Sequence, residues 1–155
     1  IIFPISDDSP YLTQDVTAAG YPMISTLGAE VKVTKGIVSA LSAPEDFSRI
    51  QVDAAVQPGN SGGPIFDEFG NVLGVVVSGF SDMQNVNFGI KASVVKNLLV
   101  ANMVELMEPR KSSINWRNFS SKVGEGTVLL SCWMTKSELA HLRKNNDKNR
   151  LLFDD

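Results

Sequence analysis

The hydrophobic positions in the first hundred residues fall into short runs, partly alternating with polar residues and separated by turn residues. Runs of this kind are typical of β-strands in a barrel or a sandwich. In the clearest hairpin, Phe69, Gly70 and Asn71 separate one apolar run from a longer one, VLGVVVSG. We therefore expect an all-β domain with strands within residues 15–22, 29–41, 49–56, 63–79 and 86–92.

The period of the pattern changes at Ser93, which is a good helix N-cap residue. From there, apolar side chains recur at helical spacing until Pro109 ends the pattern. We predict a helix from Ser93 to about Glu108 whose apolar stripe packs on the core and closes a domain over residues 1–108. The remaining tail, residues 109–155, contains a candidate strand at 126–135 and a short polar helix at 136–146.

The composition of the chain argues against several classes of function. Hydrophobic residues make up 43% and charged residues 20%, as in a globular domain, and the net charge of −3 without a basic run argues against nucleic-acid binding. Apolar stretches are too short to span a membrane. One cysteine excludes an intrachain disulfide and leaves both extracytoplasmic and cytoplasmic locations open. One cysteine and one histidine cannot build a zinc site alone, so we expect no metal and no cofactor.

The segment QPGNSGGPIF, residues 57–66, places Ser61 among glycines. It satisfies G-x-S-x-G, the nucleophile elbow of α/β-hydrolases, but that elbow requires a helix directly after the serine. Here Gly62, Gly63 and Pro64 follow, and then a β-type run. Two glycines and a proline disfavour such a helix, so the elbow interpretation fails.

A second chemistry fits the same residues. Acyl transfer needs a serine oxygen and two backbone N–H groups directed at the developing oxyanion. Glycine before the serine permits a turn that points both N–H groups the same way. Ser61 is then the candidate nucleophile, and the amides of Gly59 and Ser61 are candidate oxyanion donors, with Asn60 holding the loop and its amide as a further candidate.

The segments around this turn carry a family resemblance. VTKGIVSAL, IQVDAAVQPGNSGGPIF, GNVLGV and FGIKASVVKNL occur in this order with intact spacing between Asp15 and Leu99. Together they resemble the second half of a trypsin/chymotrypsin-fold serine protease of the HtrA/Deg type.

The resemblance implies two six-stranded barrels with the active site between them. This chain corresponds to the second barrel, followed by a helix and a short α/β tail. The catalytic histidine and aspartate are expected upstream, on an N-terminal barrel that would be a partner of this one. Val56, which is uncharged, falls at the specificity pocket, and Val77, Ser78 and Gly79 match the edge that pairs with a polypeptide substrate.

Several residues depart from related patterns. Asn60 stands where digestive proteases have an aspartate that pairs with a new amino terminus, so activation through Ile1 is not expected; HtrA-like enzymes share the asparagine. Lys35 and Lys91 replace small or proline residues, and Lys91 bears on the pocket assignment. The tail carries no carboxylate-binding glycine loop of a PDZ domain. His141 lies among lysines and arginines in the polar helix, and we interpret it as a surface side chain rather than the base.

Two functions follow. The first is a trypsin-like serine endopeptidase that acts through an acyl-enzyme and is present here as an inactive part of a longer parent. The alternative is an inactive protease-like barrel that binds proteins. The tail favours this alternative because it lies outside the segments that resemble the protease family. Without a first barrel, an apolar interface would be exposed. We therefore expect the isolated chain to form a homo-oligomer, or its tail to fold over that face.

Overall fold

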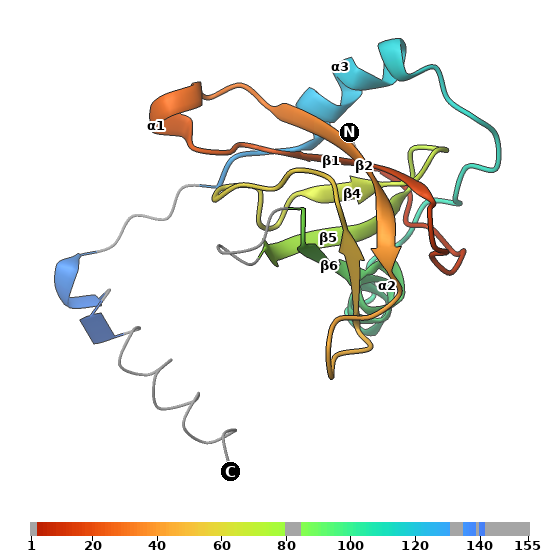
Figure 1. The fold of residues 1–155 in the computed structure, drawn as a ribbon, viewed down its shortest axis with the longest axis horizontal. Coiled ribbons are helices and arrows are strands. Elements are labelled where there is room, and N and C mark those ends of the chain that lie inside the picture. Colours follow the sequence, from red (N-terminus) through yellow and green to blue (C-terminus); the bar gives the residue numbers. More distant parts are fainter. Residues whose placement is uncertain (1–2, 80–84, 131–134, 139, 142–155) are drawn as a thin grey trace.

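The computed structural model describes residues 3–79, 85–130, 135–138, 140 and 141. Its centre is a closed antiparallel barrel in the order β1–β2–β3–β6–β5–β4 (Figure 1). This confirms the all-β architecture and selects the barrel over the sandwich. The strands are β1 (Asp15–Gly20), β2 (Lys32–Ala40), β3 (Arg49–Val52), β4 (Pro64–Phe66), β5 (Val72–Gly79) and β6 (Asn87–Lys91), and the helices are α1 (Ile24–Leu27), α2 (Ala92–Ala101) and α3 (Trp116–Gly126).

The barrel closes where β4 returns to β1, with Thr17 opposite Phe66 and Ala18 opposite Ile65. Alternate side chains of each strand point inward, as the period of two requires. They form one apolar core, and its burial is the main stabilising contribution to the barrel. The core consists of Val16, Ala18, Val38, Ile50, Val52, Ala54, Ile65, Leu73 and Val76, and Val56 packs against it.

Helix α2 is shorter than the sequence pattern predicted. It begins after Lys91 rather than Ser93 and ends at Ala101 rather than near Glu108. Met103 has a positive φ of 58°, its N–H donates to Val100 O, and the Val104 N–H donates to Leu99 O. These two hydrogen bonds form a Schellman motif, which ends the helix. Glycine is the residue that usually indicates this motif. Because methionine occupies the position, the sequence did not indicate that the helix ends here.

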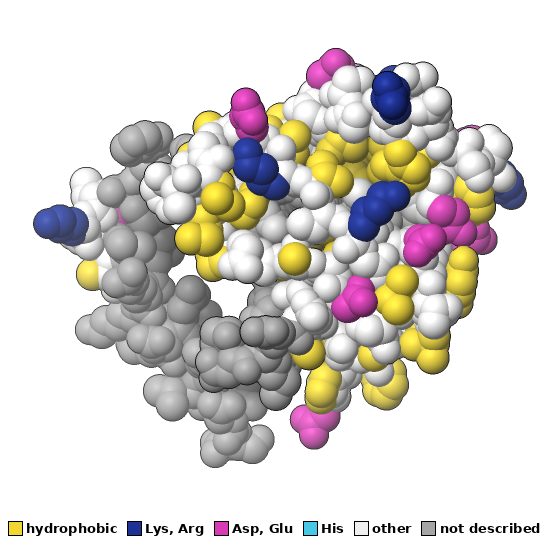
Figure 2. All heavy atoms as spheres, turned by 45° about the horizontal axis from the view of Figure 1, so that its top comes forward, with side chains coloured by type: hydrophobic (Ala, Val, Ile, Leu, Met, Phe, Trp, Pro, Cys, Tyr) yellow, Lys and Arg dark blue, Asp and Glu magenta, His cyan; other side chains and the backbone are white. Residues whose placement is uncertain are grey.

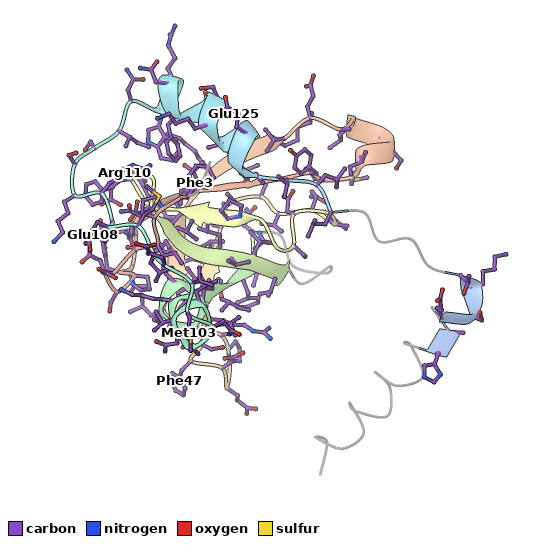
Figure 3. The ribbon with its side chains drawn as sticks, turned by 180° about the vertical axis from the view of Figure 1, so that it is seen from behind. Phe3, Phe47, Met103, Glu108, Arg110 and Glu125 are labelled. Carbon is purple, nitrogen blue, oxygen red and sulfur yellow. The ribbon has the colours of Figure 1, made fainter. Side chains whose placement is uncertain are left out.

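The apolar stripe of α2 is largely uncovered, which corrects the prediction that it packs on the core. Ala92 is the buried residue of the helix. Leu98 is 65% exposed, and Met103, beyond its end, is 96% exposed. Figure 3 shows Met103 and Phe47 at one end of the barrel, away from α3. Neither α2 nor any other helix in the described ranges has the length and apolar character to cross a membrane.

Helix α3 was not predicted. The Asn115 side chain caps it by accepting from the backbone N–H groups of Arg117 and Asn118. The strand expected at 126–135 is wrong in its described part, because Gly126 belongs to α3 and residues 127–130 form no strand, while 131–134 lie outside the described residues. Of the polar helix expected at 136–146, residues 136–138, 140 and 141 are helical, and the others lie outside the described residues.

Helix α3 lies on the outside of the barrel, on the side opposite α2 (Figure 1). Phe119 and Val123 are buried against Ala19 and Phe66 of the barrel. The Phe119 ring meets the Phe66 ring edge to face, with 5.3 Å between the ring centroids, and Phe3 packs against both. Aromatic pairs of this geometry add to the burial of their area, so a polar-looking segment becomes an integral part of the fold.

A polar anchor joins the β4–β5 turn to the segment before α3. The Asp67 carboxylate accepts from the backbone N–H groups of Phe69 and Asn71 and from Asn71 Nδ2. In turn, Asn71 Nδ2 donates to Arg110 O, and the Arg110 N–H donates to Asn71 Oδ1 at 2.7 Å. Asp67 and Asn71 are buried, and these bonds satisfy their polar groups. The anchor fixes where the chain turns back toward α3.

Candidate active site

Ser61 lies in the connection between β3 and β4 and is exposed. The chain enters this connection along Asp53, whose carboxylate accepts from the Ile37 N–H at 2.6 Å. It is also held by Asn87, whose Nδ2 donates to Ala54 O at 2.8 Å. Both bonds join the connection to strands of the barrel, so a rigid frame carries the serine.

The residues directly before Ser61 form a type II β-turn. The Asn60 N–H donates to Gln57 O at 3.0 Å, with Pro58 and Gly59 as the central residues. Gly59 has φ of +103°. Proline at the second position and a positive φ at the third define this turn type, and the third position favours glycine. The sequence therefore specifies the turn through Pro58 and Gly59.

The amides of the serine loop divide into two groups. Those of Asn60, Gly62 and Gly63 donate to Gln57 O, Val76 O and Asn60 O, respectively. Within the described residues, the amides of Gly59 and Ser61 donate to no acceptor. Unpaired backbone N–H groups are rare unless water or a ligand can reach them. The loop thus has two N–H groups, on Ser61 and two residues before it, that no described acceptor uses.

The Ser61 hydroxyl points to strand β5 and donates to Val77 O at 2.9 Å. Val77 lies at an irregularity of β5, where the register with β6 shifts between Val76 and Ser78. The pairing of β5 with β4 ends at Val75, which is opposite Pro64, whereas Ser78 and Gly79 still pair with β6. Residues 77–79 therefore lie beyond β4 on the side of the strand where Ser61 lies.

The other predicted residues also lie near the loop. Val56 is partly buried and packs against the barrel core. The neighbouring Ala55 is exposed, and its carbonyl accepts from Thr34 Oγ1 at 2.8 Å. Asn60 is buried, and its Oδ1 has no hydrogen-bond partner in the described part of the chain. Asn60 is packed closely against Gly20, where a Cβ would lie 2.7 Å from Oδ1.

Sequence reasoning missed the segment that supports the turn from the end of β1. The Met23 N–H donates to Pro58 O at 3.0 Å. A Cβ on Gly59 would lie 2.4 Å from Tyr21 O, so glycine is required there for space as well as for φ. The Gly-Tyr-Pro sequence indicated a turn, but no spacing in the sequence indicated that this turn touches residue 59.

The two lysines that depart from the family pattern have structural partners. Lys91 Nζ donates to Phe47 O at 2.7 Å, and Lys35 Nζ lies 5.5 Å from the centroid of the Trp116 ring. His141 is exposed. In the part of the chain that the structure describes, no hydrogen bond joins His141 to Ser61, and no cluster of three or more His, Cys, Asp or Glu side chains could hold a metal ion.

A closed antiparallel six-stranded barrel with an exposed serine in a glycine turn is the arrangement that the resemblance to trypsin-like serine proteases predicts. Residues 2–75 match the family model of the trypsin-like peptidase domain. The chain also resembles a crystal structure of the serine endoprotease from Yersinia pestis, with a TM-score of 0.56 and 28% identity, over 64% of this chain and 35% of that one.

Relatives by sequence narrow the class further. The chain is 37% identical over 98 residues to Protease Do-like 2, chloroplastic, of Arabidopsis thaliana, over 58% of this chain and 16% of the relative. It is 32% identical over 133 residues to an uncharacterized protein of Sinorhizobium fredii, over 78% of this chain and 21% of the relative. These matches confirm the resemblance: the chain is related to the trypsin-like serine proteases of the HtrA/Do type. The matched part of the chain spans 16% to 21% of the length of these relatives.

Proposed function

We propose that this chain is the barrel that carries the nucleophile of a serine endopeptidase, with Ser61 attacking the peptide carbonyl to form an acyl-enzyme. The observation that carries the proposal is the pair of N–H groups, on Gly59 and on the exposed Ser61 itself, that donate to no acceptor among the described residues. Two such donors are what a tetrahedral oxyanion requires. The Asn60 amide is used by Gln57 O, so its part is to close the turn.

The substrate in this proposal is an extended polypeptide. Residues 77–79 continue β5 beyond its pairing with β4, so a peptide can add there as a further strand, with main-chain hydrogen bonds providing affinity. Val56 and Ala55 carry no charge and so offer no counter-charge to a basic side chain. We therefore propose a preference for small or medium aliphatic residues before the cleaved bond.

The general base lies outside this chain in our proposal. The Ser61 hydroxyl donates to a backbone carbonyl, which cannot take its proton, and His141 lies in the exposed tail helix. A histidine and its orienting carboxylate on an N-terminal barrel would supply the base. Loss of the histidine from a serine protease costs about 10⁶-fold in rate, so the 155-residue chain alone is expected to be inactive.

The test uses the full-length gene product and a fluorophosphonate probe, with mass spectrometry to locate the adduct. We expect the probe to label Ser61, Ser61→Ala to abolish the label, and Ser93→Ala, at an exposed serine on α2, to leave it intact. A folded, full-length protein whose Ser61 is not labelled would contradict the proposal. That result would favour the alternative, a barrel that binds proteins without cleaving them.

A further inference from the structure

Tyr21 connects the serine turn to the C-terminal tail. Its hydroxyl donates to the carbonyl of Thr127 at 2.6 Å, a contact between residues 106 positions apart. Thr127 is buried and directly follows α3, where its own N–H donates to Val123 O. Because Val123 and Phe119 are packed on the barrel, the carbonyl that receives the Tyr21 hydroxyl is held in place by α3.

The other end of this connection is the Pro58–Gly59 peptide. Pro58 O accepts from the Met23 N–H, two residues after Tyr21. In a trans peptide the carbonyl and the following N–H point in opposite directions. The bond from Met23 therefore determines the direction in which the Gly59 N–H points. Rotation of this peptide, as in a type I turn, would turn the N–H away and break the bond from Met23.

We infer that Tyr21 is a positioning residue through which α3 holds the Gly59 amide in the orientation required for oxyanion binding. The hydroxyl of Tyr21 is fixed by Thr127, the Tyr21 carbonyl packs against Gly59, and the Met23 N–H holds Pro58 O. The tail thus acts on catalysis without contacting the substrate. This inference rests on the proposed function of Ser61, but the geometry can be tested without it.

The variant is Tyr21→Phe, which removes the hydroxyl and keeps the ring. The chain has one other tyrosine, Tyr11, whose hydroxyl donates to Glu68 at 3.2 Å, so Tyr11→Phe is the matched control. Amide hydrogen exchange by NMR on the 155-residue chain reports the turn directly. We expect exchange at Met23 and Asn60 to rise about fivefold in Tyr21→Phe, which corresponds to a lost hydrogen bond of about 1 kcal/mol. The amide of Ile50, in the barrel core, should change less than twofold.

The second measurement is labelling of Ser61 by the fluorophosphonate in the full-length gene product. Tyr21→Phe should lower the maximal labelling rate about fivefold and leave the half-saturating probe concentration unchanged, because the oxyanion donors act on the transition state.

Unchanged exchange at Met23 and Asn60, or an equal effect of Tyr11→Phe, would overturn the inference. Faster exchange with an unchanged labelling rate would also overturn it. Faster exchange in a protein whose wild-type Ser61 is never labelled would overturn the proposed function and support the structural connection.

Discussion

The burial of the two longer helices, α2 and α3, is the opposite of what their sequences suggest. Helix α2 is rich in valine and leucine, yet most of its apolar side chains are exposed. Helix α3 is mainly polar, yet Phe119 and Val123 are buried in an aromatic cluster on the barrel. The comparison teaches that an apolar stripe identifies the face of a helix that could be buried. Whether another element covers that face depends on the rest of the fold.

The surface on the two sides of the barrel differs accordingly. Figure 2 shows lysine and acidic side chains interspersed with apolar ones on the face that includes α3. On the opposite side, α2 and the segment after it expose Leu98, Val100, Met103 and Val104 without a covering element among the described residues. Exposed apolar side chains that gather on one side of a protein are typical of a site of association. Phe119 and Val123 of α3 are therefore covered by the barrel, whereas the exposed apolar side chains of α2 are covered by no described element.

The largest effect that distinguishes the two sides should come from Phe119→Ala. Removal of a buried phenylalanine lowers the free energy of unfolding by about 3–5 kcal/mol, because contacts are lost and a cavity remains. Phe47→Ala is the control at a phenylalanine that is 83% exposed, and it should change the free energy by less than about 0.5 kcal/mol. Urea denaturation measures both. Equal effects would show that α3 does not stabilise the barrel.

The polar anchor before α3 should give the next largest effect. Asn71→Ala removes the partners of the Arg110 N–H and carbonyl and one donor to the Asp67 carboxylate. Buried polar groups left without partners cost about 1–3 kcal/mol, and we expect a loss of unfolding free energy in that range. Asn118→Ala, at an exposed position of α3, serves as the control. A loss no larger than that of the control would rule out the anchor as a stabilising element.

The barrel and the serine turn could be predicted from sequence because their signals are local. Short apolar runs bounded by turn residues indicate the strands, and Pro58 followed by Gly59 specifies a type II turn. The end of α2 could not be predicted, since its Schellman motif has Met103 where glycine is usual. The packing partners of Phe119 could not be predicted either, because Phe66 and Phe3 are distant from it in the sequence.

The candidate active site shows the same difference between local sequence signals and long-range contacts. Ser61 and Gly59 were predicted as site residues from five consecutive residues, whereas no sequence spacing indicates the contacts of Tyr21 with Thr127 and Gly59. The Gly-Tyr-Pro sequence predicted a turn but not the residues that this turn contacts. Local backbone geometry can therefore be predicted from a single sequence. The contacts that hold this geometry in place join residues that are distant in the sequence, so they cannot be predicted in the same way.

Asp67 adds a pH dependence to the anchor on the α3 side. Burial raises the pKa of its carboxyl above the ordinary value, although hydrogen bonds from Asn71 and Phe69 oppose the shift. A folded pKa above the unfolded value means that folding favours the protonated acid. The contribution of Asp67 to the free energy of unfolding is therefore full below pH of about 3.9 and decreases as the pH rises through the folded pKa.

This dependence is isolated by comparison with Asp67→Asn, which cannot titrate. We expect the free energy of unfolding of the wild type, minus that of the variant, to fall as the pH rises from about 3 to 6. Urea denaturation at several pH values measures the difference. A difference that rises over this range would mean that the hydrogen bonds to the carboxylate outweigh its burial.

The smallest effect on stability, and the sharpest test of the exposed α2 face, should come from Leu98→Gln. The side chain is 65% exposed, so the free energy of unfolding should change by less than about 0.5 kcal/mol. We predict that the wild-type chain self-associates through this face and that the substitution shifts it toward the monomer in sedimentation velocity experiments. Leu12→Gln, at a leucine that is 53% exposed outside α2, should leave the association unchanged. A wild-type chain that stays monomeric at high concentration would show that the α2 face does not bind a second copy, and its partner would then be another protein segment, such as the proposed N-terminal barrel.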